Sequence, residues 1–243
     1  MAKKRIIWLV LLVILFLNIV FFIHTRVDNG ITAEDILYIQ KILTEGGNVR
    51  PLSPNRSYQE EIDFIRTVQN AVLAIIAKGE CLPKGTSREP KYVYLARCGE
   101  SYDKSKVIEK ILRNFSFKTR HIMIFSAEHT GSKVKSLLSK EAFSHSVTEV
   151  LTSKGWLVLD PDDHWLSLDD RGQPVSIARI QSDTDVSLIS WDQAGLTKMP
   201  LVYQHPFTFV YGLYSRHGKF YPSYNFIPDI NWREFAYNLM VNF

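Results

Sequence analysis

Residues 144–161 read SHSVTEVLTSKGWLVLDP and decide the fold expected for this chain. Two runs rich in β-branched and apolar residues flank Thr152-Ser153-Lys154-Gly155, a pattern typical of antiparallel strands joined by a tight turn. The strands are expected at Ser144–Leu151 and Trp156–Asp160. The hairpin predicts an antiparallel sheet.

The same hairpin places a histidine near a carboxylate. If the turn is centred between Ser153 and Lys154, Asp160 lies opposite Val147, and His145 is its diagonal neighbour on the same face. The backbones at such diagonal positions are about 7–8 Å apart, a gap that two side chains of this length can bridge. A pairing shifted by two residues would put the two directly opposite or move them apart. The pattern is therefore compatible with a His–Asp pair.

Cys98 comes just ahead of a segment that is expected to be helical. Residues 97–115 read RCGESYDKSKVIEKILRNF, and their apolar residues recur on one helical face. A helix N-terminus stabilises negative charge and so favours the thiolate of a nearby cysteine, although the carboxylate of Glu100 opposes this. Cys98, His145 and Asp160 thus supply the three groups of a thiol nucleophile, its base and the residue that orients the base.

Further elements are expected on both sides of these residues. Apolar residues at helical spacing predict a short helix within Asp28–Gly47 and a second helix at Glu60–Ala77, with Gly46–Ser57 as a linker. A strand is expected at Thr119–Phe125. Aromatic residues near the C-terminus follow strand spacing and are expected to pack in the core, with a carbohydrate- or partner-facing surface as the alternative; they include Phe207, Phe209, Tyr211 and Tyr214, ahead of an expected turn at Arg216–Lys219.

The overall composition excludes several classes of protein. With 46% hydrophobic and 22% charged residues, the 243-residue chain has the balance of a globular protein, not of a disordered one. The formal net charge of +4 arises in residues 1–26, which hold four basic residues and no acid. The neutral remainder argues against nucleic acid as a partner. Two cysteines, Cys81 and Cys98, are too few for a disulfide-stapled scaffold or a four-cysteine zinc site.

The N-terminus has the pattern of a membrane anchor. Ile6–Ile23 reads IIWLVLLVILFLNIVFFI, long enough at about 1.5 Å per residue to cross most of a bilayer core of about 30 Å. Three basic residues precede this run and Arg26 alone follows it closely, which predicts an N-terminus in the cytoplasm and a body outside the cytoplasmic (inner) membrane. A cleaved signal peptide is the alternative, but the run lacks a small-x-small cleavage site.

The division of the chain follows from this anchor. Residues 1–26 are expected to form the cytoplasmic stub and the transmembrane signal anchor, and residues 27–59 a juxtamembrane helix and linker. Residues 60–243 are expected to form one domain with an aromatic-rich C-terminal extension, because about 180 residues suffice for a sizeable core.

The order of these elements resembles the core of the transglutaminase-like superfamily, a papain-like thiol fold, in a membrane-anchored bacterial form. The resemblance covers about Glu60–Ser176 and rests on Cys98 at a helix start, on LRNFSFKTRHIMI at Leu112–Ile124 and on His145 in SHSVTEV. Its most specific element is GWLVLDP at Gly155–Pro161. The resemblance implies an α+β fold, with the cysteine-bearing helix packed on an antiparallel sheet that bears the histidine and the aspartate.

The same resemblance implies a function. Cys98 would be the nucleophile, His145 the general base and acid, and Asp160 the residue that orients His145. The reaction would be acyl transfer through a thioester on a peptide or carboxamide bond of a protein or peptide substrate, and it requires no cofactor. Hydrolysis and transfer to a second amine use the same residues, so both stay open.

Three alternatives stand beside this interpretation. The domain could be a catalytically silent scaffold or ligand-binding module that serves cell-envelope or polysaccharide assembly. Outside the cytoplasm, Cys81 and Cys98 could form a disulfide, which would make Cys98 structural. A metal site is the third, but no metal is expected because the histidines lack short metal-ligand spacing; they include His121, His129, His145 and His164.

Overall fold

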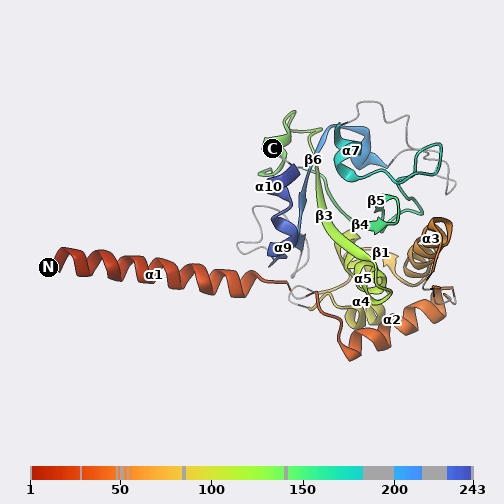
Figure 1. The fold of residues 1–243 in the computed structure, drawn as a ribbon, viewed down its shortest axis with the longest axis horizontal. Coiled ribbons are helices and arrows are strands. Elements are labelled where there is room, and N and C mark those ends of the chain that lie inside the picture. The colour runs from red at the N-terminus through yellow and green to blue at the C-terminus, as the bar shows by residue number, and fades with distance from the viewer. Residues whose placement is uncertain are drawn as a thin grey trace.

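An antiparallel four-stranded sheet forms the middle of the fold in a computed structural model of the chain (Figure 1). The strand order is β5-β4-β3-β6. The strands are β3 (Lys118–Ser126), β4 (Ser144–Thr152), β5 (Gly155–Leu159) and β6 (Phe207–Tyr211). The structure describes residues 2–27, 29–47, 49, 52–53, 55–83, 86–139, 142–182, 200–214 and 229–241. The expected α+β class is confirmed; the expected turn at 216–219 lies outside the described residues.

The hairpin has the register expected from its turn. Thr152 pairs with Gly155 and Thr148 pairs with Leu159, so the turn is centred between Ser153 and Lys154. Continuation of this register places Asp160 across from Val147, just beyond the last paired residue of β5. Of the registers left open by the sequence, the one that makes position 160 the diagonal neighbour of position 145 is therefore the one present.

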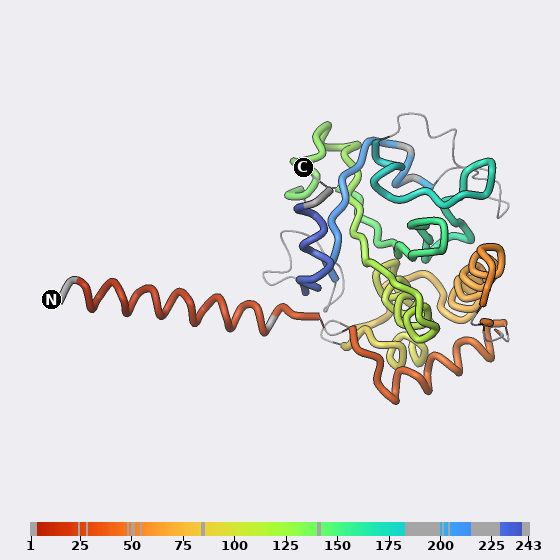
Figure 2. The backbone as a smooth tube through the Cα atoms, in the orientation of Figure 1, coloured from red at the N-terminus to blue at the C-terminus, as the bar shows by residue number. Residues whose placement is uncertain are grey.

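Four helices cover one face of the sheet, and Figure 2 shows their arrangement as a smooth tube. They are α2 (Ala33–Gly46), α3 (Tyr58–Ile75), α4 (Pro90–Ala96) and α5 (Ser101–Asn114). Helices α2 and α3 begin at capping boxes formed by Thr32 with Asp35 and by Ser57 with Glu60. Helix α5 packs directly on β3 and β4. These helices enclose the larger of the two main cores.

The α2 helix belongs to that core. Ile39 and Ile42 are completely buried, and α2 contacts α3, α4 and α5. The carboxylate of Asp35 forms a buried ion pair with Lys110 of α5 at 2.8 Å. The segment at residues 27–59, which was expected to hold a helix and a linker, therefore contributes a helix that packs against the helices of the body.

The other face of the sheet supports a second core. It is built from alternate residues of β3, β4 and β5, from the loop after β5 and from β6; its buried members include Ile122, Ile124, Val147, Val158, Trp165, Val175, Ile177, Phe207, Phe209 and Tyr211. The aromatic residues expected in the core are thus buried, including Tyr214. The remaining short elements are β1 (Ala77–Lys78), β2 (Cys98–Gly99), α6 (Lys133–Ser136), α7 (Ile177–Ser182), α8 (Leu201–Gln204), β7 (Leu213–Tyr214), β8 (Asp229–Ile230), α9 (Trp232–Phe235) and α10 (Asn238–Val241).

A long apolar helix, α1 (Ala2–Thr25), extends away from the body (Figures 1 and 2). Its segment Lys4–Ile23 has a mean hydropathy of 3.2, and none of it is buried against the body. Length, composition and exposure are compatible with a single-pass membrane anchor. The body is attached to its C-terminal end.

Candidate functional site

The end of the β4–β5 hairpin brings the predicted histidine and carboxylate together. Nε2 of His145 lies 2.9 Å from Oδ2 of Asp160, within hydrogen-bond distance. Asp160 is completely buried and His145 is 8% exposed. Since β5 ends at Leu159, Asp160 takes no part in the pairing of β5 with β4. Its side chain reaches diagonally across to His145 of β4. The expected contact is present, whereas the catalytic roles assigned to it remain predictions.

The loop after β5 holds the Asp160 carboxylate in one orientation. Its Oδ1 accepts hydrogen bonds from the backbone N–H groups of Asp162 at 2.8 Å and of Asp163 at 3.3 Å. The Asp160 carbonyl accepts a hydrogen bond from Nε2 of Gln69, a buried side chain of α3, at 2.7 Å. Both carboxylate oxygens are thus engaged, one by the turn and one by His145. This is the arrangement needed to fix an imidazole in one orientation.

Charges around His145 favour its protonated form. Burial acts to lower the pKa of His145, but the charge and hydrogen bond of Asp160, together with the charge of Asp162, raise it above its ordinary value of 6.5. The nearby ammonium of Lys78 acts in the opposite direction. The imidazolium is therefore stabilised, as expected for a base that must hold a proton during a reaction.

Asp162 connects this pair to α5 and β1. It forms ion pairs with Nζ of Lys104 at 2.5 Å and with Nζ of Lys78 at 2.8 Å. Burial acts to raise the pKa of Asp162, but the charges of His145 and Lys104 outweigh it and lower the pKa. Lys104 is 1% exposed and comes from the first turn of α5. The start of α5 is thereby fixed against the loop that carries the His–Asp pair.

The structure corrects the prediction for Cys98. Its sulfur is bonded to that of Cys81, with the two Cα atoms 5.8 Å apart. A sulfur in a disulfide has no thiolate to donate, so the oxidised chain offers no nucleophile at Cys98. Cys98 also lies before Glu100, the N-cap of α5, and pairs with Ala77 in a short parallel ladder. The alternative pairing of the two cysteines is the one present.

Ser101 occupies the position at the helix start that was expected for Cys98. It is the first residue of α5, and its Oγ accepts a hydrogen bond from the backbone N–H of Ser146 at 3.1 Å. That nitrogen is bonded to the carbonyl carbon of His145, so the Ser101 hydroxyl lies beside the histidine backbone. The sequence contained a signal for this: Glu100 and Asp103 form a capping box, which marks 101 as the first helical position.

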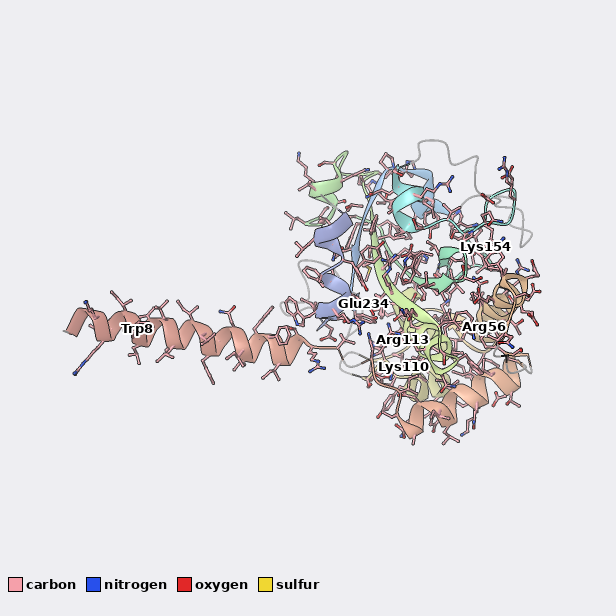
Figure 3. The ribbon with its side chains drawn as sticks, in the orientation of Figure 1. Trp8, Arg56, Lys110, Arg113, Lys154 and Glu234 are labelled. Atoms are coloured by element: carbon pink, nitrogen blue, oxygen red, sulfur yellow. A yellow bond between two sulfur atoms is a disulfide. The ribbon has the colours of Figure 1, made fainter. Side chains whose placement is uncertain are left out.

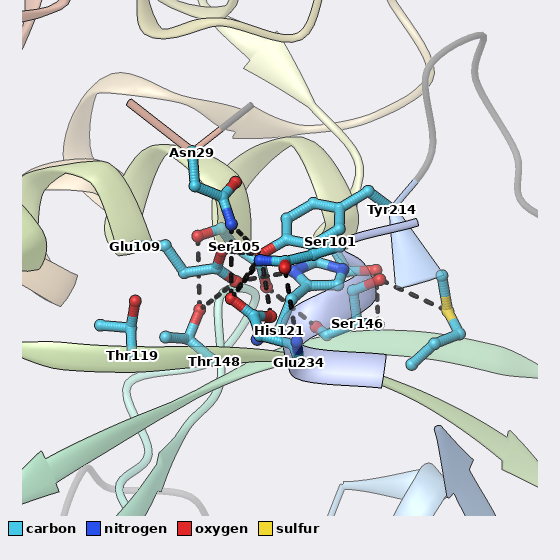
Figure 4. A network of polar contacts seen from close by, with 12 residues as sticks. Asn29, Ser101, Ser105, Glu109, Thr119, His121, Ser146, Thr148, Tyr214 and Glu234 are labelled. Carbon is cyan, nitrogen blue, oxygen red and sulfur yellow. Dashed lines mark hydrogen bonds and ion pairs between the residues drawn. The ribbon is translucent and has the colours of Figure 1, made fainter. Parts of the chain in front are cut away.

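A second buried polar cluster lies between α5 and β3, and Figure 4 shows it from close by. Nδ1 of His121 is 2.6 Å from a carboxylate oxygen of Glu109, and the hydroxyl of Tyr214 donates to Glu109 at 2.9 Å. Glu234 accepts hydrogen bonds from the His121 backbone N–H at 2.9 Å and from Arg113 at 2.7 Å. This cluster joins segments distant in sequence.

Two neighbouring carboxylates in this cluster have pKa values displaced in opposite directions. Burial acts to raise the pKa of Glu109, but the charge and hydrogen bond of His121 and the charge of Arg113 lower it overall. Burial and the charge of Glu109 raise the pKa of Glu234. The charged side chains of the cluster form their hydrogen bonds and ion pairs mainly with other members of the cluster.

Among the described residues, no group of three or more histidine, cysteine, aspartate or glutamate side chains is placed to hold a metal ion. His121 and His145 belong to the two sites above, and Nδ1 of His164 pairs with Asn70 at 2.7 Å.

No family model, no curated protein and no solved structure matches the chain.

Proposed function

We propose that this chain is a membrane-anchored hydrolase or transferase that cleaves peptide, carboxamide or related acyl bonds, as the resemblance to the transglutaminase-like superfamily implies. The observation that carries the proposal is the hydrogen bond between His145 and Asp160 beside the first residue of α5. A buried carboxylate that orients an imidazole, next to a helix N-terminus, is a recurrent arrangement for activating a nucleophile.

In the oxidised chain, Ser101 is the nucleophile that this proposal requires. Nε2 of His145 faces Asp160, which leaves Nδ1 as the nitrogen that would take a proton from the nucleophile. Ser101 would have to turn its hydroxyl toward that nitrogen, because in the structure its Oγ accepts a hydrogen bond from the Ser146 backbone N–H on the α5 side of the sheet. The serine Oγ then attacks the carbonyl carbon, and the imidazolium gives its proton to the leaving amine. Water, deprotonated by the same nitrogen, resolves the acyl-serine ester, or a second amine takes the acyl group.

The start of α5 favours the charge that develops in this reaction. The first backbone N–H groups of a helix have no partner within the helix, and the helix dipole is positive at that end. The N–H groups of Ser101 and Tyr102 are of this kind. They are the candidate donors to the oxygen of a tetrahedral intermediate.

Cys98 remains a candidate nucleophile for the reduced chain alone. Reduction of the bond to Cys81 would release a thiol ahead of the same helix, and the thioester chemistry implied by the resemblance would then use the same histidine. The α1 helix would hold either form at the cytoplasmic membrane. The basic residues at the start of α1, ahead of its apolar run, favour a body on the outer side.

A catalytically silent module is the second candidate function. The observation that favours it is the disulfide, which removes from the oxidised chain the thiol on which the family resemblance depends. Such a module would bind a cell-envelope or polysaccharide-assembly partner and perform no chemistry.

A fluorophosphonate probe, which labels activated serines, tests the proposal on the full-length chain in detergent without reductant. We expect labelling at Ser101, its loss in Ser101→Ala, and a decrease of at least about 100-fold in His145→Ala, the contribution typical of a general base. Ser105→Ala is the matched control, since Ser105 lies one turn further along α5 and donates to the carbonyl of Ser146. It should label like wild type.

A parallel reaction of the reduced chain with iodoacetamide separates the remaining possibilities. Rapid alkylation of Cys98 that slows in His145→Ala, together with no serine labelling, would replace Ser101 by Cys98 as the nucleophile. No activated residue in either form would leave the silent module as the function.

A further inference from the structure

A cavity of about 700 Å³ lies where α1 meets the body, away from the His145–Asp160 site. Its walls come from the C-terminal end of α1, the end of α5, the start of β3 and α9; they include Phe22, Arg26, Arg113, Lys118, Arg120 and Arg233. Figure 3 labels Glu234 on the side of the body that faces α1. The walls are strongly basic.

Three of these cations are available to a ligand. Arg26, Lys118 and Arg233 are exposed and form no ion pair with any residue that the structure describes. By contrast, Arg113 pairs with Glu234, the single acidic residue among the described residues of the cavity wall, and Arg120 pairs with Glu149. The charge of Glu234 is thus already balanced, and the cavity keeps a surplus of positive charge.

The cavity lies at the level where α1 would leave a membrane. The apolar run ends at Ile23, and Phe22 stacks on Trp232 with ring centroids 5.2 Å apart. The backbone N–H of Val27 donates to the carbonyl of Ile230 at 3.0 Å. Aromatic side chains of this kind are typical of the boundary between hydrocarbon and water. A membrane around α1 would therefore bring its headgroups to the mouth of the cavity.

We infer that this cavity binds the phosphate of an anionic phospholipid headgroup from the membrane that holds α1. The inference rests on α1 lying in a membrane and is independent of the proposed acyl chemistry. The volume of the cavity, about 700 Å³, is large enough for a phospholipid headgroup. Guanidinium groups bind phosphate oxygens through paired hydrogen bonds, and Trp232 and Phe22 offer an apolar surface to the adjoining acyl chains. The three available cations would replace the counterions of the lipid.

Binding of soluble short-chain phosphatidylglycerol tests the inference, with the full-length chain in a non-ionic detergent and short-chain phosphatidylcholine as the neutral comparison. We expect phosphatidylglycerol to bind more tightly. Each basic residue near an anionic lipid strengthens binding about fivefold, so the triple variant Arg26→Ala, Lys118→Ala, Arg233→Ala should bind phosphatidylglycerol on the order of 100-fold more weakly.

A matched triple variant controls for net charge. Lys41, Lys154 and Arg171 are exposed, form no ion pair within the described part of the chain and do not line the cavity; Figure 3 labels Lys154 on the side of the body opposite α1. Their replacement by alanine removes the same charge and should change the affinity less than twofold.

Equal losses in the two triple variants would overturn the inference, as would equal binding of the two lipids. Inorganic phosphate and glycerol phosphate distinguish a lipid from a free phosphate. If either competes at the concentration at which the lipid binds, the cavity is a site for soluble phosphate and the assignment to a membrane lipid is wrong.

Discussion

The imidazole of His145 and the carboxylate of Asp160 meet at 2.9 Å because β5 ends one residue before Asp160 while β4 continues beyond it. The turn after β5 occupies the second carboxylate oxygen, so the aspartate cannot rotate away without losing two backbone hydrogen bonds. The His145–Asp160 contact therefore depends on where β5 ends relative to β4 and on the turn at Asp160–Asp163, which holds the carboxylate.

The charge of Asp160 should control the titration of His145. Asp160→Asn removes the charge that raises the pKa of His145, so we expect this pKa to fall, measured by NMR of the imidazole Cε1–H. Asp169→Asn, a carboxylate in a different turn, should leave it unchanged. An unchanged His145 titration in Asp160→Asn would mean that the two side chains are not paired in solution.

The raised pKa of His145 determines how the stability of the fold and the labelling of Ser101 should change with pH. Because the pKa of His145 is raised in the folded state, its stabilising contribution is complete below about pH 6.5 and is lost as the pH rises through the folded-state pKa. Acyl chemistry needs the neutral imidazole, so labelling of Ser101 should increase as the pH rises through that same pKa. In Asp160→Asn the labelling curve should move to lower pH, and its amplitude should fall.

The disulfide should stabilise the fold without supporting the chemistry. It closes a loop between residues separated by 17 positions, which corresponds to about 3 kcal/mol in the loop-entropy description. The double variant Cys81→Ser, Cys98→Ser should therefore unfold at lower urea concentration than the oxidised wild type and should still react with the serine probe. If its labelling disappears while its secondary structure persists, the disulfide or the thiol takes part in the site.

The Tyr214 hydroxyl should contribute measurably to stability. Tyr214→Phe keeps the ring that stacks on His121 at 4.1 Å but removes the donor to the buried Glu109. We expect a loss of about 1–3 kcal/mol in the free energy of unfolding, the cost of leaving a buried acceptor without its partner. Tyr92→Phe, at a ring that is 38% exposed, should change it by less than about 0.5 kcal/mol. Similar values for both variants would argue against the buried network.

The core position of α2 can be tested by truncation of one side chain. Ile42→Ala should cost about 2–5 kcal/mol, because Ile42 is completely buried among the helices. Leu37→Ala, on the same helix at 49% exposure, should cost little. If both substitutions prove neutral in thermal unfolding of the full-length chain, α2 is a juxtamembrane appendage after all.

Regular hydrophobic patterns made much of the fold predictable. Alternation in SHSVTEVL and GWLVLDP, with a tight turn between them, predicted two strands but left their register open, and the helical spacing of Val107 to Leu112 predicted α5. Helix α4 was not predicted, since its seven residues are too few for a clear period. Patterns of this kind describe which face of an element is buried. They predicted a helix within Asp28–Gly47, but not that α2 packs against the helices of the body, because periodicity does not say which partner covers the buried face.

The residue at the start of α5 was harder to predict than the His–Asp pair. A cysteine attracts a chemical interpretation, whereas a serine at a helix start is most often a structural residue. The capping pair Glu100 and Asp103 was the better guide, because it locates the first turn through backbone hydrogen bonds and not through side-chain reactivity. The pairing of Cys81 with Cys98 depends on the short ladder between β1 and β2. Each of these strands has two residues, which are too few to give a recognisable strand pattern in the sequence.

The backbone hydrogen bond between Val27 and Ile230 fixes the position of the body relative to α1. A long flexible tether would let the body sample a wide shell of solvent above its anchor, but here almost no chain separates the end of α1 from a residue fastened to the body. With α1 in a membrane, the working distance of the His145 site from the bilayer would be nearly constant. If the site acts as proposed, it would meet membrane-bound substrates by lateral diffusion and would not reach those attached at another height.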